Sequence, residues 1–153
     1  MYPFIIAAFM VVLPGLSVAA EAMMRGVPLS IVLVGKWFVF WMVGVRLLAA
    51  GLRQISQPEY TARTILKLTG NDALVVIREL GFANVAIGIL GIASLFVAGW
   101  ALAAAVSGGI FYGLAGINHA MQNHRNRLEN VAMASDLVAA AFLLAWCFWA
   151  ATR

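Results

Sequence analysis

Long apolar stretches separated by short polar loops dominate the pattern of this chain. The run from residue 80 to residue 118 contains no charged side chain, and as one helix it would be about 58 Å long, too long for a single bilayer crossing. A tight turn at residues 98–100 therefore divides it. We expect an all-α integral membrane protein with transmembrane helices over about residues 2–20, 28–53, 72–98, 100–121 and 130–150.

The second of these segments has two interpretations. A helix over residues 28–53 would be about 39 Å long, longer than a hydrocarbon core of about 30 Å, and would carry both Lys36 and Arg46. Either it is a long tilted helix in which Lys36 reaches one membrane surface, or residues 26–35 form a separate interfacial piece and the span begins at Lys36. We favour the long helix.

The end of the first segment resembles a secretory signal, because small residues at 17–22 follow the apolar run. No basic residue precedes the run, so we expect a retained span rather than a cleaved signal. Pro14 lies inside this span and predicts a kink, since proline cannot donate the helical hydrogen bond.

A short polar interval between the second and third segments has a different periodicity. Glu59, Arg63 and Lys67 recur at every fourth position, with apolar residues between them, and Pro58 suits a helix start. We expect a short amphipathic helix over about residues 57–69 that lies on the membrane surface and ends at Gly70.

Composition agrees with a lipid-facing surface. The chain is 64% hydrophobic and 10% charged, with a mean hydropathy of +0.97, whereas soluble domains have about 25% charged residues. The net charge of +4 comes from Lys and Arg in short loops, where orientation and anionic lipid headgroups explain it, so we expect membrane lipids and no nucleic acid as partners. No linker divides the chain, which indicates a single membrane domain over residues 1–153.

The basic residues also predict an orientation. With five spans, one side of the membrane carries Arg53, Arg63, Lys67, Arg125 and Arg127, and the other carries Arg25, Lys36 and Arg153. Because cytoplasmic loops are enriched in Lys and Arg, we expect the first side, and with it the N-terminus, to be cytoplasmic.

Small residues and tryptophans predict how the spans pack. Glycine pairs spaced for close helix approach are present in three segments: Gly44 with Gly51, Gly88 with Gly91, and Gly109 with Gly113. Trp146 and Trp149, near the end of the last segment, are expected as anchors at the membrane interface, and the lone Cys147 beside them as a packed thiol.

Ionisable residues inside the apolar segments are the strongest functional clue. Each charge at bilayer depth costs at least ~2.5 to 3.5 kcal/mol, so each should face a partner or a cavity. These residues, all toward the same side, are Arg46, Arg78, Glu79, His119 and Asp136. We expect Arg46 to pair with Glu79 and His119 with Asp136. The alternative is that such pairs only fix the register of the helices.

The fourth segment adds a polar face. Tyr112 and His119 share one side of the predicted helix, and Asn118 and Gln122 stand beside it. Such a face could line a pocket for a carbonyl or quinone head group, or could simply join helices through polar contacts.

Cofactor chemistry is limited by what is present. A haem would need two axial ligands, and only His119 is well placed, because His124 falls in a polar loop. We therefore do not expect haem, a metal site or catalytic residues, and no nucleotide-binding or hydrolase motif is present. A quinone, whose head group could bind to the polar face of the fourth segment, remains as the candidate cofactor.

From residue 38 to the C-terminus, the order of features resembles the DoxX-like superfamily of small bacterial membrane proteins. The matching stretches are residues 44–52, an amphipathic connection after Pro58, Glu79-Leu80-Gly81 opening the next span, and a tight hairpin followed by two more spans. The resemblance implies a four-helix transmembrane bundle in a bacterial inner membrane and, in some members, a link to quinone-dependent redox systems. This chain would add one N-terminal transmembrane helix and the interfacial helix.

These observations predict a small accessory or ligand-binding membrane subunit that is not an enzyme, with a polar intramembrane cluster that holds a quinone or a lipid-like molecule. One alternative is a transporter or proton-relay protein that uses the ionisable residues. Another is a structural subunit of a homo-oligomer or of a complex with another membrane protein, in which the cluster locks the helices together.

Overall fold

The computed structural model describes residues 2–152, and that part of the chain is helical with no strand. Three of the elements, labelled η, are π-helical turns within or between α-helices. The elements are α1 (Tyr2–Ala7), η1 (Ala8–Val12), α2 (Leu13–Arg25), α3 (Ile31–Phe38), η2 (Val39–Val45), α4 (Arg46–Ser56), η3 (Tyr60–Ile65), α5 (Asp72–Ala93), α6 (Trp100–Ala120) and α7 (Arg127–Ala151).

Within the described residues, 5 continuous helices are long and apolar enough to cross a membrane. They are Pro3–Arg25, Ile31–Ser56, Asp72–Ala93, Trp100–Ala120 and Arg127–Ala151. The expectation of an all-helical membrane protein is confirmed at this level. The second helix runs unbroken for 26 residues, as the long-helix interpretation requires.

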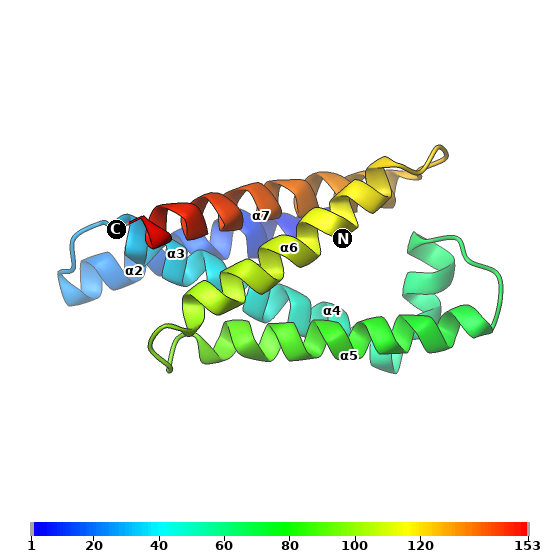
Figure 1. The fold of residues 1–153 in the computed structure, drawn as a ribbon, viewed down its shortest axis with the longest axis horizontal. Helices are drawn as coiled ribbons and strands as arrows, with labels where there is room; N and C mark the ends of the chain where they lie inside the picture. The colour runs from blue at the N-terminus through cyan, green and yellow to red at the C-terminus, as the bar shows by residue number, and fades with distance from the viewer. Residues whose placement is uncertain (1, 153) are drawn as a thin grey trace.

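The helices run between two ends of an elongated molecule (Figure 1). One end carries η3 and the turn between α6 and α7, and we call it the η3 end. The other carries the turns at residues 26–30 and 94–99 together with the C-terminus, and we call it the C-terminal end. Gly26 and Gly99 form these turns with positive φ values of 62° and 83°, which side chains other than glycine adopt at a cost.

The interfacial segment is shorter than the periodicity predicts. Helical structure over the expected residues 57–69 ends at Ile65, and the chain turns at Lys67, which has a φ of 57°, instead of continuing to Gly70. The segment is also tied to its surroundings. The Asn126 side-chain amide donates to the Ile65 carbonyl at 2.8 Å, and the Arg53 guanidinium lies 3.7 Å from the Tyr60 ring. Residues from three parts of the chain therefore close the η3 end.

Pro14 is accommodated by a wider helical turn. The Leu13 N–H donates to the carbonyl of Ala8, five residues earlier, so η1 absorbs the turn at which the proline ring would otherwise collide with the preceding backbone. The predicted irregularity at Pro14 is thus present as a π-helical segment in the first span.

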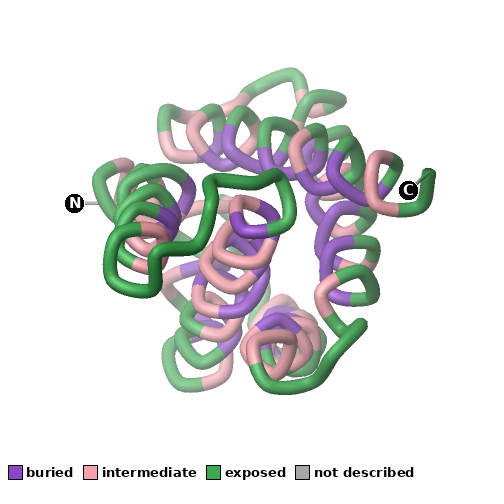
Figure 2. The backbone as a smooth tube through the Cα atoms, turned by 90° about the vertical axis from the view of Figure 1, so that its left-hand side faces the viewer, coloured by how far each residue is buried: buried purple, intermediate pink, exposed green. Residues whose placement is uncertain are grey.

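A glycine seam joins α5 to the second span. A methyl group added at Gly51 would lie 2.6 Å from the carbonyl oxygen of Gly81, and one added at Gly88 would lie 2.6 Å from the backbone nitrogen of Leu48. Only glycine permits so close a backbone approach. The buried faces turn toward one another in this way across the bundle, while exposed apolar residues cover the outside (Figure 2).

Trp146 of α7 packs against α3, a contact that the sequence alone does not predict. Trp146 is buried rather than placed as an exposed anchor, lies against Gly35, and donates its indole N–H to the carbonyl of Ile31 at 3.0 Å. Gly35 leaves the room that the indole fills. Cys147 is buried beside it, as expected.

Candidate functional site

A cavity of about 650 Å³ lies at the η3 end. Its walls come from the N-terminal turns of the first span and from α4, η3, α5, α6 and α7. The lining combines apolar side chains with polar ones, which are Arg46, Arg53, Gln54, Tyr60, Thr61, Asn84, Tyr112, Asn118, His119 and Asp136. The cavity is of the size that holds a small organic ligand, and mixed lining of this kind fixes such a ligand's orientation.

A buried ion pair forms the polar centre of this cavity. The Arg46 guanidinium donates to Asp136 at 2.6 Å and to the Ser135 hydroxyl at 2.9 Å, and the two charged side chains are 8% and 11% exposed. The partner of Arg46 is therefore Asp136, and the expected pair with Glu79 was wrong. Arg46 comes from the second span and Asp136 from the last, so only the tertiary fold brings them together.

The backbone just before Arg46 is itself unusual. The Arg46 N–H donates to the carbonyls of Trp41 and Val43 instead of to Met42, its α-helical acceptor. The hydroxyl of Tyr112 donates to that Met42 carbonyl at 2.5 Å, and the Tyr112 ring lies 4.6 Å from the Arg46 guanidinium. The π-helical turn η2 thus sets the direction of Arg46, and a buried tyrosine from α6 supports both its backbone and its charge.

A pair of buried amides lines the α5 side. The Asn84 side chain donates to Oε1 of Gln54 at 2.7 Å. Its own Oδ1 is buried and has no hydrogen-bond partner among residues 2–152. The sequence alone does not identify either residue as part of a site, because the role of a single amide in an apolar segment depends on which helix packs against it.

Asn118, His119 and Gln122 were predicted to line one pocket, but only Asn118 and His119 do so in the structure. His119 and Asn118 line the cavity from α6, whereas Gln122 lies beyond the lining. Nδ1 of His119 is buried without a hydrogen-bond partner in the described residues. The expected pair of His119 with Asp136 is therefore two side chains facing the same cavity, without a hydrogen bond through that nitrogen.

Arg78 and Glu79 do not belong to this site. Both are exposed on the outer side of α5, and neither lines the cavity. The opposite side of the helix is the one that meets α4, through Gly81 and Gly88. Their position next to each other in the sequence gave no indication of which way they would point.

Two of the cavity's walls come from α5 and α6. These helices meet at the turn of residues 94–99 and diverge toward the η3 end (Figure 1). Leu80 lines the cavity from α5 and Leu114 from α6, where Leu114 is 65% exposed. Apolar side chains of these two membrane-spanning helices therefore border the polar interior.

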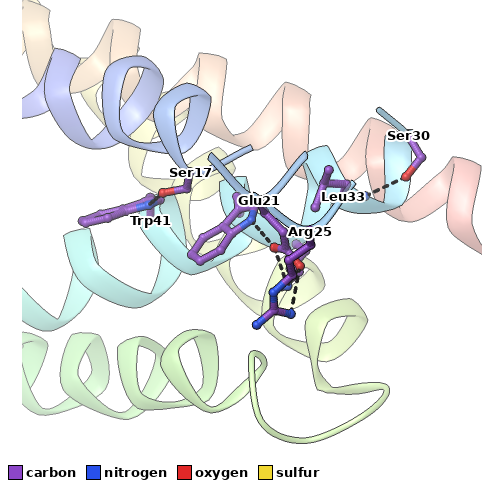
Figure 3. A network of polar contacts seen from close by, with 8 residues as sticks. Ser17, Glu21, Arg25, Ser30, Leu33 and Trp41 are labelled. Atoms are coloured by element: carbon purple, nitrogen blue, oxygen red, sulfur yellow. Dashed lines mark hydrogen bonds and ion pairs between the residues drawn. The ribbon is translucent and has the colours of Figure 1, made fainter. Parts of the chain in front are cut away.

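A second polar network occupies the C-terminal end. Lys36 donates to both oxygens of Glu21 at 2.8 and 2.7 Å, and the indole of Trp37 donates to the same carboxylate at 2.7 Å (Figure 3). About one helical turn from this network on the same two helices, the Trp41 indole donates to the Ser17 hydroxyl at 2.9 Å. Glu21 lies in the stretch that resembles a secretory signal, yet its carboxylate joins the first span to the second.

The residues described offer little to a metal ion. Among residues 2–152, no three His, Cys, Asp or Glu side chains come close enough together to hold one. The donors that line the cavity at the η3 end are instead suited to hydrogen bonds.

Comparison with known proteins places the chain in a family without a known activity. A family model described as "Family of unknown function (DUF6790)" matches residues 1–153. The chain belongs to this family. No curated protein and no solved structure matches it.

Proposed function

We propose that this member of DUF6790 is a small integral membrane protein that binds an amphipathic molecule, quinone-like or lipid-like, in the cavity at the η3 end, as an accessory or ligand-carrying subunit rather than an enzyme. The observation that carries the proposal is a cavity whose lining combines apolar side chains with two buried polar atoms that have no hydrogen-bond partner among residues 2–152. A head group would sit among the polar side chains and an apolar tail would lie along the apolar side chains of α5 and α6.

Electrostatics favours an uncharged head group. The buried charges of Arg46 and Asp136 compensate each other at 2.6 Å, and the other charged residue of the lining, Arg53, is exposed, so a further charge buried at the polar centre would lack a partner there. Neutral hydrogen-bonding groups can instead pair with the polar atoms of α5 and α6 at little cost. This agrees with the quinone-linked role that the DoxX-like resemblance implies for some proteins.

The membrane assignment completes the proposal. We place the protein in a bacterial inner membrane with its N-terminus and the η3 end on the cytoplasmic side, because Arg53, Arg63, Lys67, Arg125 and Arg127 gather there. A periplasm-active reporter fused after residue 153 should be active, and a cysteine introduced at residue 124 should resist impermeant reagents added from outside. An active cytoplasmic reporter at the same C-terminal position would reverse this orientation.

The binding proposal is tested by what the protein carries. The wild type is purified from bacterial membranes in mild detergent, and its organic extract is analysed by mass spectrometry. The expected result is a stoichiometric amphiphile in the wild type that is lost in His119→Phe. His124→Phe is the matched control, because His124 is exposed and outside the cavity. Identical extracts from both variants would remove the cavity from consideration as a binding site.

A proton relay is the second proposal, supported by the presence of His119 and Asp136 in one cavity with Arg46. In proteoliposomes loaded with a pH-sensitive dye, it requires proton flux that Asp136→Asn and His119→Phe both abolish and that His124→Phe leaves unchanged. Absence of wild-type flux above that of empty liposomes would exclude it.

A further inference from the structure

Two unpaired polar atoms define what the head group in the cavity must offer. Oδ1 of Asn84 and Nδ1 of His119 are both buried without a hydrogen-bond partner among residues 2–152, and both residues line the cavity. Asn84 is only 3% exposed. Burying a polar atom without a partner is unfavourable, so such an atom normally pairs with another protein group, an ordered water or a bound molecule.

The chemistry of the two atoms differs. The Asn84 nitrogen already donates to Gln54 at 2.7 Å, which leaves a carbonyl oxygen that can only accept a hydrogen bond. Nδ1 of a neutral histidine either donates or accepts, according to which tautomer is present. A ligand must therefore donate at Asn84 and can do either at His119.

Position adds a second constraint. Asn84 comes from α5 and His119 from α6, two helices that diverge toward the η3 end (Figure 1). A molecule held by both would therefore carry hydrogen-bonding groups on two sides of its head. Phe9 and Phe111 also line the cavity and offer aromatic surfaces to a flat ring.

We propose that the cavity binds a quinol, through one hydroxyl that donates to Asn84 and a second that pairs with His119, in preference to the corresponding quinone. A quinol hydroxyl both donates and accepts, whereas a quinone carbonyl only accepts and would face the Asn84 oxygen without a hydrogen between them. The inference concerns binding alone and involves no electron transfer. It rests on the proposed amphipathic ligand and deepens it.

The test compares four probes on the full chain in lipid nanodiscs, with dissociation constants measured by calorimetry. The probes are a short-chain 1,4-benzoquinone with one isoprenoid unit, its hydroquinone kept reduced under anaerobic conditions, the dimethyl ether of that hydroquinone, and a monoacylglycerol. The hydroquinone should bind on the order of tenfold more tightly than the quinone and the dimethyl ether, since one buried acceptor is satisfied only by the first.

A variant of Asn84 tests whether this residue causes the preference for hydroquinone over quinone. Asn84→Leu keeps a similar side-chain size but removes the acceptor, so hydroquinone and quinone should bind it equally. Asn123→Leu is the matched control, because Asn123 is exposed and lies outside the cavity lining, and it should keep the tenfold ratio. A ratio is informative here because a merely structural loss would weaken both probes alike. If Asn84→Leu does not fold, the comparison of probes on the wild type still decides.

The possible results distinguish the quinol preference from the more general proposal that the cavity binds an amphipathic molecule. Equal binding of hydroquinone and quinone to the wild type would overturn the quinol preference and leave the quinone-like ligand standing. Tighter binding of the monoacylglycerol than of the hydroquinone would overturn the quinol as the occupant of the cavity and favour a lipid-like ligand. No binding of any probe would overturn both proposals.

Discussion

Two ion pairs of nearly equal length hold the two ends of this molecule, and their surroundings differ. At the η3 end, Arg46 and Asp136 lie 2.6 Å apart with side chains 8% and 11% exposed, in the wall of a cavity. At the C-terminal end, Lys36 and Glu21 lie 2.7 Å apart, and Lys36 is 33% exposed. The first pair joins the second span to the last, whereas the second joins neighbouring spans across a short turn.

The comparison shows that distance alone says little about the role of a charge pair. Glu21 has the Lys36 ammonium, the Trp37 indole and Arg25 around it, so removing one partner leaves others. Asp136 depends on Arg46 for its paired charge in a buried setting. Both pairs line a cavity, of about 570 Å³ at the C-terminal end and about 650 Å³ at the η3 end. The C-terminal pair is a partly exposed clamp between two helices, whereas the η3-end pair is buried in both partners.

The largest expected effect comes from breaking the buried pair. Arg46→Ala strands the Asp136 carboxylate and should lower the free energy of unfolding in detergent by about 3 to 5 kcal/mol. Arg46→Ala combined with Asp136→Ala should lose much less than the sum of the single variants, as measured by denaturant titration. Strict additivity would show that the two side chains are not energetic partners, and the contrast between the two ends would fail.

A second prediction asks what holds the α5 wall of the cavity. Gly51→Val places side-chain atoms against the backbone of α5 and should cost about 1 to 3 kcal/mol of unfolding free energy. Gly15→Val is the matched control, because no atom outside its own helix backbone lies within 4 Å of an added methyl group there. Equal stability of the two variants, in the same titration, would mean that the glycine seam does not fix α5.

A smaller effect is expected at the clamp. Glu21→Gln keeps hydrogen-bonding capacity toward Trp37 and removes a charge whose partner Lys36 is a third exposed, so about 1 kcal/mol should be lost. The loss should shrink at high salt, whereas that of Arg46→Ala should not, because buried pairs are poorly screened. A loss at Glu21 as large as that at Arg46 would remove the distinction between the two ends.

The smallest effect is predicted for the outermost charge. Arg25 is 73% exposed and lies 3.5 Å from Glu21, so Arg25→Ala should change the unfolding free energy by no more than about 0.5 kcal/mol. Its unfolding curve should overlay that of the wild type. A clear destabilisation would indicate that Arg25 belongs to the clamp rather than to the solvated surface.

The candidate site was only partly predictable from the chain. Arg46, Tyr112, Asn118, His119 and Asp136 were recognised as polar residues in apolar segments and do line the cavity. Arg78 and Glu79 were recognised by the same rule and face outward. The rule detects polarity and cannot detect direction, because the direction of a side chain depends on which side of its helix is covered.

The local backbone was a further source of error. The π-helical turn before Arg46 shifts that residue relative to a regular helix, and nothing in the apolar sequence around it predicts the shift. Glu79 was expected to pair with Arg46 because both lie toward the same side of the membrane at a common depth, whereas in the structure Arg46 pairs with Asp136 from the last span.

The sequence by itself determined that the chain is helical, that its long apolar helices are suited to a bilayer, and where the short turns between them fall. These properties follow from hydrophobic length and from local backbone chemistry, which act within one segment. The tertiary structure alone decided that Arg46 meets Asp136, that Asn84 meets Gln54, and that α4, α5, α6 and α7 together line a cavity. Those outcomes depend on contacts between distant segments, and in an apolar chain many such contacts are nearly equal in energy until glycine seams and a few polar groups select one arrangement.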